Sequence, residues 1–179
     1  GCGGRGGMGP AVGGLGGGSG AGGATSGRGS TTRTGTSGKG DVSLARKSEP
    51  FDGHDYLQDA IRDGASAVIV SRAPKLSSLG VPVYEVSDTL IALGALGRYW
   101  RRAWGKTIIG VAGSNGKTST KDLVRAALSC SYAVHATTGN LNNRIGVPIS
   151  LLSLQPAAEL AVSELGTRLP GGVALLRDL

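Results

Sequence analysis

The fold is decided by one stretch of sequence, Thr107-Ile108-Ile109-Gly110-Val111-Ala112-Gly113-Ser114-Asn115-Gly116-Lys117-Thr118. Residues 107–112 form a short apolar run that is typical of a strand. Residues 119–129 have helical spacing, and their predicted buried face consists of Leu123, Val124, Ala127 and Leu128. A strand, a glycine loop and a helix in direct succession are the context that a phosphate-binding loop requires. The sequence therefore predicts an α/β fold with a mostly parallel sheet.

The loop itself predicts nucleotide binding. Its glycines allow backbone N–H groups to turn toward phosphate oxygens, and the first helical turn adds further unpaired donors. Lys117 supplies a point charge for the β- and γ-phosphates, and the Thr118 hydroxyl can bind Mg²⁺. Val111 stands where the general pattern has glycine, so a tight turn with an incidental lysine is the alternative. The predicted nucleotide-binding residues are Gly113, Ser114, Asn115, Gly116, Lys117, Thr118 and Ser119.

Two later segments add polar candidates. Residues 132–136 are predicted to be a strand that runs into a loop with asparagines at positions 140, 142 and 143. These side chains could contact a ligand or be ordinary turn residues. His135, among apolar neighbours, is interpreted as a structural histidine. Residues 159–166 are predicted to be another strand, and Glu164 near its carboxyl end is placed to hold Mg²⁺, with an ordinary surface carboxylate as the alternative.

The N-terminal part has a different composition. Residues 1–40 contain 19 of the 33 glycines, and all seven aromatic residues lie at position 51 or beyond. Residues 1–50 are therefore predicted to be low-complexity and disordered, although residues 41–45 hint at a strand. An Arg-Gly tail that binds RNA is the alternative, but such tails usually interleave aromatic residues. Nucleic acid is disfavoured as a partner.

The rest of the chain divides into three predicted parts. Residues 51–87 are predicted to close an incomplete α/β domain, with a helix at 54–62 and strands at 67–70 and 81–86. Residues 88–106 are predicted to form a linking helix, and residues 107–179 the first part of a nucleotide-binding domain.

Several classes of protein are excluded by composition. No apolar run approaches the ~20 residues that a membrane span needs, and the N-terminus has no hydrophobic segment of signal-peptide type. Two cysteines, Cys2 and Cys130, are too few for a disulfide framework or a metal cluster, which fits a cytoplasmic protein.

Four segments together resemble the Mur ligase family. They are Phe51-Asp52-Gly53-His54-Asp55-Tyr56, residues 110–120 with the Gly-x-x-Gly-x-x-Gly-Lys-Thr spacing, residues 135–148 with Gly-Asn-Leu-Asn-Asn, and Glu164-Leu165-Gly166. The first and third segments are most similar to the branch that joins D-alanyl-D-alanine to UDP-N-acetylmuramoyl-tripeptide. The resemblance covers roughly residues 51–172.

The resemblance implies an ATP-dependent peptide ligase of cytoplasmic peptidoglycan synthesis, with ATP and Mg²⁺ as cofactors and a monomeric state. It implies that Lys117 and Glu164 are catalytic, that Thr118 and Glu164 hold the metal, and that Asn140 contacts the nucleotide. The family's three-domain plan extends beyond Leu179, so the chain by itself is expected to be a truncated, inactive piece.

Some positions depart from the family pattern. Residues 30–34 only faintly match the uridine-side segment, and residues 168–172 differ from the usual continuation. A shifted reading frame before Phe51 is one hypothesis for the change in composition. The diamino-acid-adding sister ligase and folylpolyglutamate synthase remain alternatives, as does a non-ligating nucleotide-binding protein with a basic RNA-binding tail.

Overall fold

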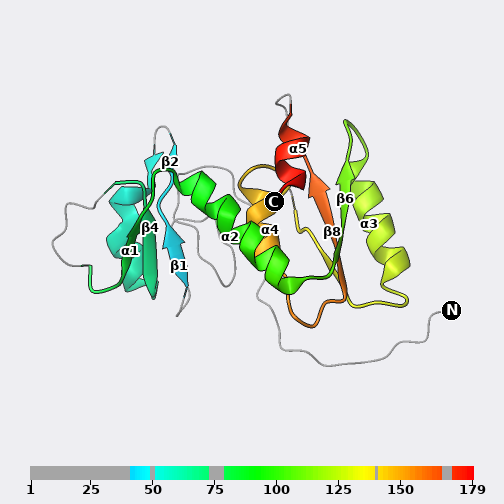
Figure 1. The fold of residues 1–179 in the computed structure, drawn as a ribbon, viewed down its shortest axis with the longest axis horizontal. Coiled ribbons are helices and arrows are strands. Elements are labelled where there is room, and N and C mark those ends of the chain that lie inside the picture. Colours follow the sequence, from blue (N-terminus) through cyan, green and yellow to red (C-terminus); the bar gives the residue numbers. More distant parts are fainter. Residues whose placement is uncertain (1–40, 49–50, 73–78, 140, 167–170) are drawn as a thin grey trace.

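The computed structural model describes residues 41–48, 51–72, 79–139, 141–166 and 171–179. Two α/β units lie side by side, with one long helix running from the first to the second (Figure 1). The α/β class predicted from the sequence is therefore confirmed. Among the described residues, no helix is both long and apolar enough to cross a membrane.

The first unit is a small parallel sheet in the order β1-β4-β5. A 3₁₀ turn runs directly into a short helix on one face of this sheet, as the sequence predicted for residues 54–62. A two-residue antiparallel pair, β2 with β3, precedes that turn. The elements are β1 (Val42–Leu44), β2 (Lys47–Ser48), β3 (Phe51–Asp52), η1 (Gly53–Tyr56), α1 (Leu57–Arg62), β4 (Ala67–Val70) and β5 (Val83–Glu85).

Strand β1 belongs to the stretch that composition alone assigned to low-complexity sequence. It pairs in parallel with β4, with Val42 opposite Ala67 and Leu44 opposite Ile69. Leu44 is buried in a cluster that includes Ile69, and Ala45 is buried in a separate cluster that includes Leu57 of α1. The described part of the first unit therefore begins at Asp41, ahead of the boundary expected at Phe51. Residues 1–40 lie outside the described part.

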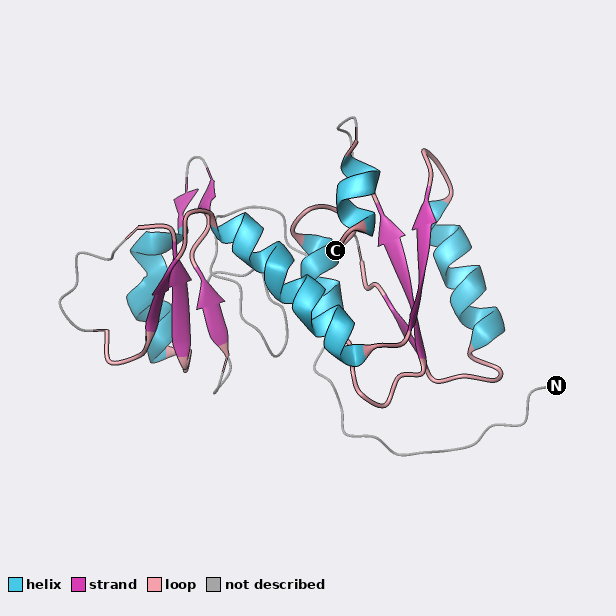
Figure 2. Cartoon of the chain, in the orientation of Figure 1, coloured by secondary structure: helices cyan, strands magenta, loops and turns pink. Residues whose placement is uncertain are grey.

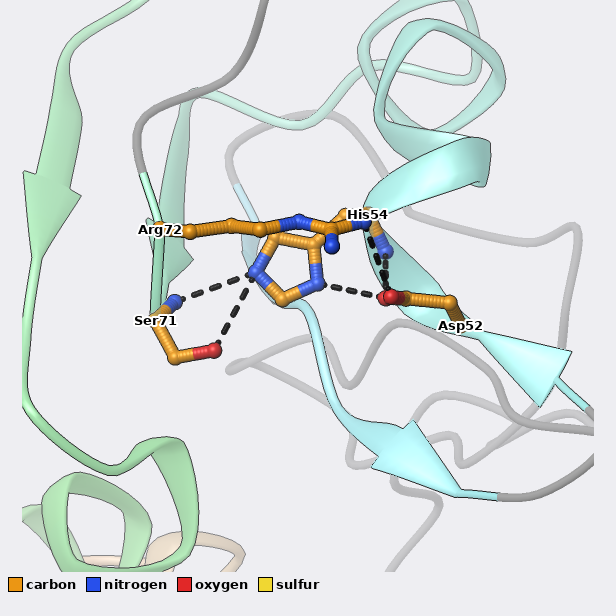
Figure 3. A network of polar contacts seen from close by, with 4 residues as sticks. All are labelled: Asp52, His54, Ser71 and Arg72. Carbon is orange, nitrogen blue, oxygen red and sulfur yellow. Dashed lines mark hydrogen bonds and ion pairs between the residues drawn. The ribbon is translucent and has the colours of Figure 1, made fainter.

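A polar network ties the 3₁₀ turn to the end of β4 (Figure 3). The Ser71 backbone N–H donates to Nε2 of His54 at 3.1 Å, so Nδ1 carries the ring proton and donates to Asp52 at 2.6 Å. Arg72 donates to the other Asp52 oxygen at 2.9 Å. Burial alone would raise the pKa of Asp52, but the hydrogen bonds from His54 and the charge of Arg72 hold it below its usual value.

Asp52→Asn is expected to lower the melting temperature at pH 7, because the folded state loses an acceptor for His54 and Arg72. A carboxyl group whose pKa is lowered by folding stabilises the protein above its unfolded pKa, about 3.9. The difference from wild type should therefore shrink as the pH falls through the folded pKa of Asp52. Thermal melts between pH 7 and pH 2 measure this difference. Asp59→Asn, which removes an exposed ion pair with Arg62, is the control; a pH-independent deficit in Asp52→Asn would contradict the account.

The linking helix is α2 (Thr89–Trp104), close to the predicted range. The Asp88 carboxylate caps its start by accepting from the N–H groups of Leu90 and Ile91. Both tryptophans pack against the second unit, since their indole N–H groups donate to the carbonyls of Leu154 and Gln155.

Helix α4 (Gly146–Leu152) joins the two units. Ile149 of α4 shares a buried cluster with Leu93 of α2 and with Leu44 and Ile69 of the first sheet. The backbones of α2 and α4 approach closely at Gly97, where a Cβ would lie 3.0 Å from Cα of Pro148. The first unit therefore packs directly on an element of the second.

The second unit is a parallel sheet in the order β6-β8-β7. Helix α3 lies along one side of it, and α2 and α4 lie on the other side (Figure 2). A cluster around Trp104, Leu151 and Leu176 fills the side of α2, α4 and α5. The elements are β6 (Thr107–Ala112), α3 (Lys117–Leu128), β7 (Val134–Ala136), β8 (Leu160–Leu165) and α5 (Gly172–Arg177).

The buried face of α3 differs from the one that was predicted. Leu123 is 71% exposed and Ala127 is also exposed, whereas Lys121 is only 4% exposed. Val124 and Leu128 are half-buried, as expected for the inner side. The prediction failed at Leu123 and Ala127 because the helix turns Thr118 and Lys121, one turn apart, toward the strand ends.

Candidate functional site

The predicted phosphate loop and the predicted metal residue meet at one edge of the second sheet. Strands β6 and β8 run in parallel, with Val111 opposite Glu164. The loop of residues 113–116 leaves β6 at its carboxyl end and enters α3 at Lys117. Open parallel sheets bind ligands at this edge because loops and helix N-termini converge there.

The start of α3 is open toward an anion. Gly116 is its N-cap residue with φ +72°, a backbone conformation that favours glycine, and no side chain in the described part of the chain caps this helix. The first turn of an α-helix has N–H groups without intrahelical acceptors, and the helix dipole places partial positive charge there. Ser114, Asn115 and Ser119 are exposed beside it. The loop therefore has the features of a phosphate site.

Lys117 adds the cationic group. Its Nζ lies over the loop and donates to the carbonyl oxygens of Gly113 and Ser114 at 2.8 and 3.2 Å. The side chain is thus folded back along the loop rather than extended into solvent. An ammonium group held here can contact an anion that occupies the loop.

Glu164 is the buried acid of the site, at 3% exposure. The Thr118 hydroxyl donates to its Oε2 at 2.9 Å, and the Asn142 amide donates to its Oε1 at 2.8 Å. None of the described lysines, arginines or histidines forms an ion pair with it. Burying a carboxylate without a cationic partner costs free energy. Buried charges in proteins are usually paired or bound to a metal ion, so Glu164 is a candidate ligand for a cation.

The three asparagines of the loop after β7 have different positions. Asn142 is part of the site because its side-chain amide donates to Glu164. Its backbone carbonyl also accepts from the Gly166 N–H at 2.7 Å. Asn143 is a turn residue, since its Oδ1 accepts from the N–H groups of Ile145 and Gly146 at the start of α4. Asn140 lies outside the described residues, so its nucleotide contact stays a prediction. The sequence alone could not show which of these asparagines contacts the site and which is an ordinary turn residue.

His135 is a structural histidine, as interpreted from its neighbours. Its Nε2 lies 3.4 Å from the Ser153 hydroxyl. Burial lowers the pKa of His135, which favours the neutral ring.

The donors present at this edge suit Mg²⁺. The Thr118 hydroxyl and the Glu164 carboxylate are hard oxygen ligands that already lie within hydrogen-bond distance of each other. Within the described ranges no group of three or more His, Cys, Asp and Glu side chains could hold a metal. Mg²⁺ needs no such cage, because it is commonly bound by one or two protein oxygens together with phosphates and water.

Comparison with known proteins agrees with this geometry. The family model of the Mur ligase middle domain matches residues 111–177. The UDP-N-acetylmuramoyl-tripeptide–D-alanyl-D-alanine ligase of Synechocystis is 43% identical over 140 residues, which cover 78% of this chain and 31% of that protein. The chain belongs to the Mur ligase family. The ligase of the same name from Escherichia coli is 40% identical over 145 residues, covering 80% of this chain and 31% of that protein.

Solved Mur ligase structures share the fold. The MurF ligase of Thermotoga maritima, solved in complex with ADP, superimposes with a TM-score of 0.70 at 36% identity, covering 77% of this chain and 32% of that one. This Mur ligase chain spans about a third of the length of the relatives it matches.

Proposed function

We propose that this Mur ligase chain is part of a cytoplasmic, ATP-dependent ligase that joins D-alanyl-D-alanine to UDP-N-acetylmuramoyl-tripeptide in peptidoglycan precursor synthesis. The names of its relatives support the substrates, and the ADP complex of the Thermotoga maritima ligase supports the nucleotide. The single observation that carries the proposal is the hydrogen bond between Thr118 and Glu164, because it joins a phosphate loop to an acid suited to Mg²⁺.

The proposed reaction has two steps. A carboxylate oxygen of the tripeptide attacks the γ-phosphorus of ATP, and the bond from that phosphorus to the β-phosphate oxygen breaks, which gives an acyl phosphate and ADP. The amine of D-alanyl-D-alanine then attacks the acyl carbon, loses a proton, and displaces inorganic phosphate as the peptide bond forms.

The residues of this chain neutralise the negative charge of the phosphates and align the reacting groups. The N–H groups at the start of α3 and the Lys117 ammonium group bind phosphate oxygens, which reduces the repulsion between ATP and the incoming carboxylate. Thr118 and Glu164 would hold Mg²⁺, which when bound supplies further positive charge at the phosphates. Asn142 orients the Glu164 carboxylate for that task. Asn140 is proposed to contact the nucleotide.

The test uses the protein encoded by the complete reading frame that contains this sequence. With ATP, Mg²⁺, UDP-N-acetylmuramoyl-tripeptide and D-alanyl-D-alanine, it is expected to release phosphate and form the pentapeptide product. Omission of any one component should stop both. Product formation from UDP-N-acetylmuramoyl-dipeptide and a free diamino acid, in place of the tripeptide and D-alanyl-D-alanine, would assign the chain to the sister ligase instead. The absence of any product would contradict ligation.

A further inference from the structure

Lys121 is a buried lysine that the nucleotide site does not use directly. It lies in the second turn of α3 at 4% exposure, on the side facing β7 and β8. Lysine is almost never fully buried unless it is paired, because an ammonium group removed from water must find other partners. Its position therefore needs a reason beyond filling space.

The partners of Lys121 lie at the end of β7. Its Nζ donates to the Thr137 carbonyl oxygen at 3.0 Å and lies 3.5 Å from a carboxylate oxygen of its neighbour Asp122. Thr137 follows the last residue of β7, and its own N–H donates to the Val162 carbonyl of β8 at 3.0 Å. Lys121 thus links α3 by a hydrogen bond to the residue that directly follows β7.

Thr137 connects this point to Glu164. Its hydroxyl accepts a hydrogen bond from the backbone N–H of Glu164 at 3.3 Å. The same hydroxyl lies 3.3 Å from the hydroxyls of Ser150 and Ser163. All four residues are buried. The chain of contacts therefore runs from Lys121 through Thr137 to the backbone of the acid that faces Thr118.

We propose that Lys121 is a positioning residue, which holds Thr137 and thereby fixes Glu164 for Mg²⁺. The inference rests on the proposed function of Glu164. It differs from a purely structural role in one respect: the loss of the Lys121 contact should change the geometry at Glu164, and with it the response to Mg²⁺, beyond any effect on stability.

The test compares Lys121→Met with Lys106→Met in this chain. Lys106 is a matched control because its Nζ also donates to backbone carbonyls, those of Pro156 and Ala158, both at 2.7 Å and away from the site. Lys121→Met is expected to raise the Mg²⁺ concentration needed for half-maximal ATP binding about tenfold, as outer-sphere substitutions commonly do. Lys106→Met should leave it unchanged.

A second readout needs no nucleotide. Amide hydrogen exchange, measured by NMR, should be about tenfold faster at Glu164 in Lys121→Met, since a hydrogen bond to a charged group is lost one contact away. The Ala161 amide, earlier in the same strand, should not change. If wild type bound no ATP, the proposed function would fail, and the exchange at Glu164 would still show whether Lys121 restrains the Glu164 backbone through Thr137.

Thr137→Val covers the case in which Lys121→Met fails to fold. It removes only the hydroxyl that accepts from Glu164, and it is expected to shift the Mg²⁺ dependence and the Glu164 exchange in the same direction. The inference would be overturned if a folded variant had the same Mg²⁺ dependence of ATP binding and the same Glu164 amide exchange as wild type. A lowered melting temperature in that variant would not rescue the inference.

Discussion

Replacing Glu164 by glutamine is expected to remove the effect of Mg²⁺ on ATP binding while leaving the chain at least as stable as wild type. Loss of the charged ligand should weaken apparent Mg²⁺ affinity roughly 100-fold or more, above the loss typical of outer-sphere substitutions. Stability should not fall, because the glutamine oxygen can still accept from Asn142 and the Thr118 hydroxyl can turn to accept from the new amide. The substitution also removes a buried charge that has no cationic partner among the described residues.

Calorimetric ATP titrations with and without Mg²⁺, together with thermal melts, measure both effects. Glu159→Gln is the matched control, because Glu159 lies just before the other end of β8 and accepts from the Ala133 N–H at its exposed position. A Glu164→Gln chain that keeps the Mg²⁺ response would show that Glu164 is not a metal ligand.

Lys117→Met is expected to weaken ATP binding about 10- to 100-fold, the loss that corresponds to one hydrogen bond to a charged group. The loss should be similar with and without Mg²⁺, because the ammonium group contacts phosphate directly. This separates Lys117 from Glu164, whose replacement matters only when Mg²⁺ is present. The two backbone contacts of Lys117 in the loop are exposed, so the melting temperature should change little.

Lys106→Met again serves as the control for loss of a lysine that donates to carbonyl oxygens. An undiminished affinity in Lys117→Met would remove the lysine from the proposed mechanism.

The elements with strong local patterns could be predicted from the sequence. The apolar run of residues 107–112 coincides with β6. The predicted linking helix of residues 88–106 contains α2, because a cap residue such as Asp88 acts through local chemistry. The meeting of Lys117, Thr118 and Glu164 was also predictable, since the carboxyl ends of parallel strands share one edge.

Helix α4 was not predicted, because Gly146 and Pro148 read as breakers. Proline is compatible with the first turn of a helix, where the N–H it lacks would have no intrahelical acceptor. Helix α4 therefore begins with two residue types that more often mark the end of a helix.

Asn142 and Lys121 depended on tertiary contacts. Nothing local distinguishes Asn142, which holds Glu164, from Asn143, which caps a turn. The burial of Lys121 depends on the Thr137 carbonyl, 16 residues away in the chain. Hydrophobic periodicity assigns such a lysine to solvent, and only the packing of α3 on the strand ends reverses that assignment.

The central claim is that the loop before α3 binds the phosphates of ATP together with Mg²⁺ held by Thr118 and Glu164. It is tested most directly by isothermal titration of this chain with ATP, once in excess Mg²⁺ and once in EDTA, with circular dichroism to confirm folding. The account predicts saturable binding at one site that is tighter in Mg²⁺ and is weakened by Lys117→Met. A folded chain that showed no binding heat at millimolar ATP in either buffer would contradict it.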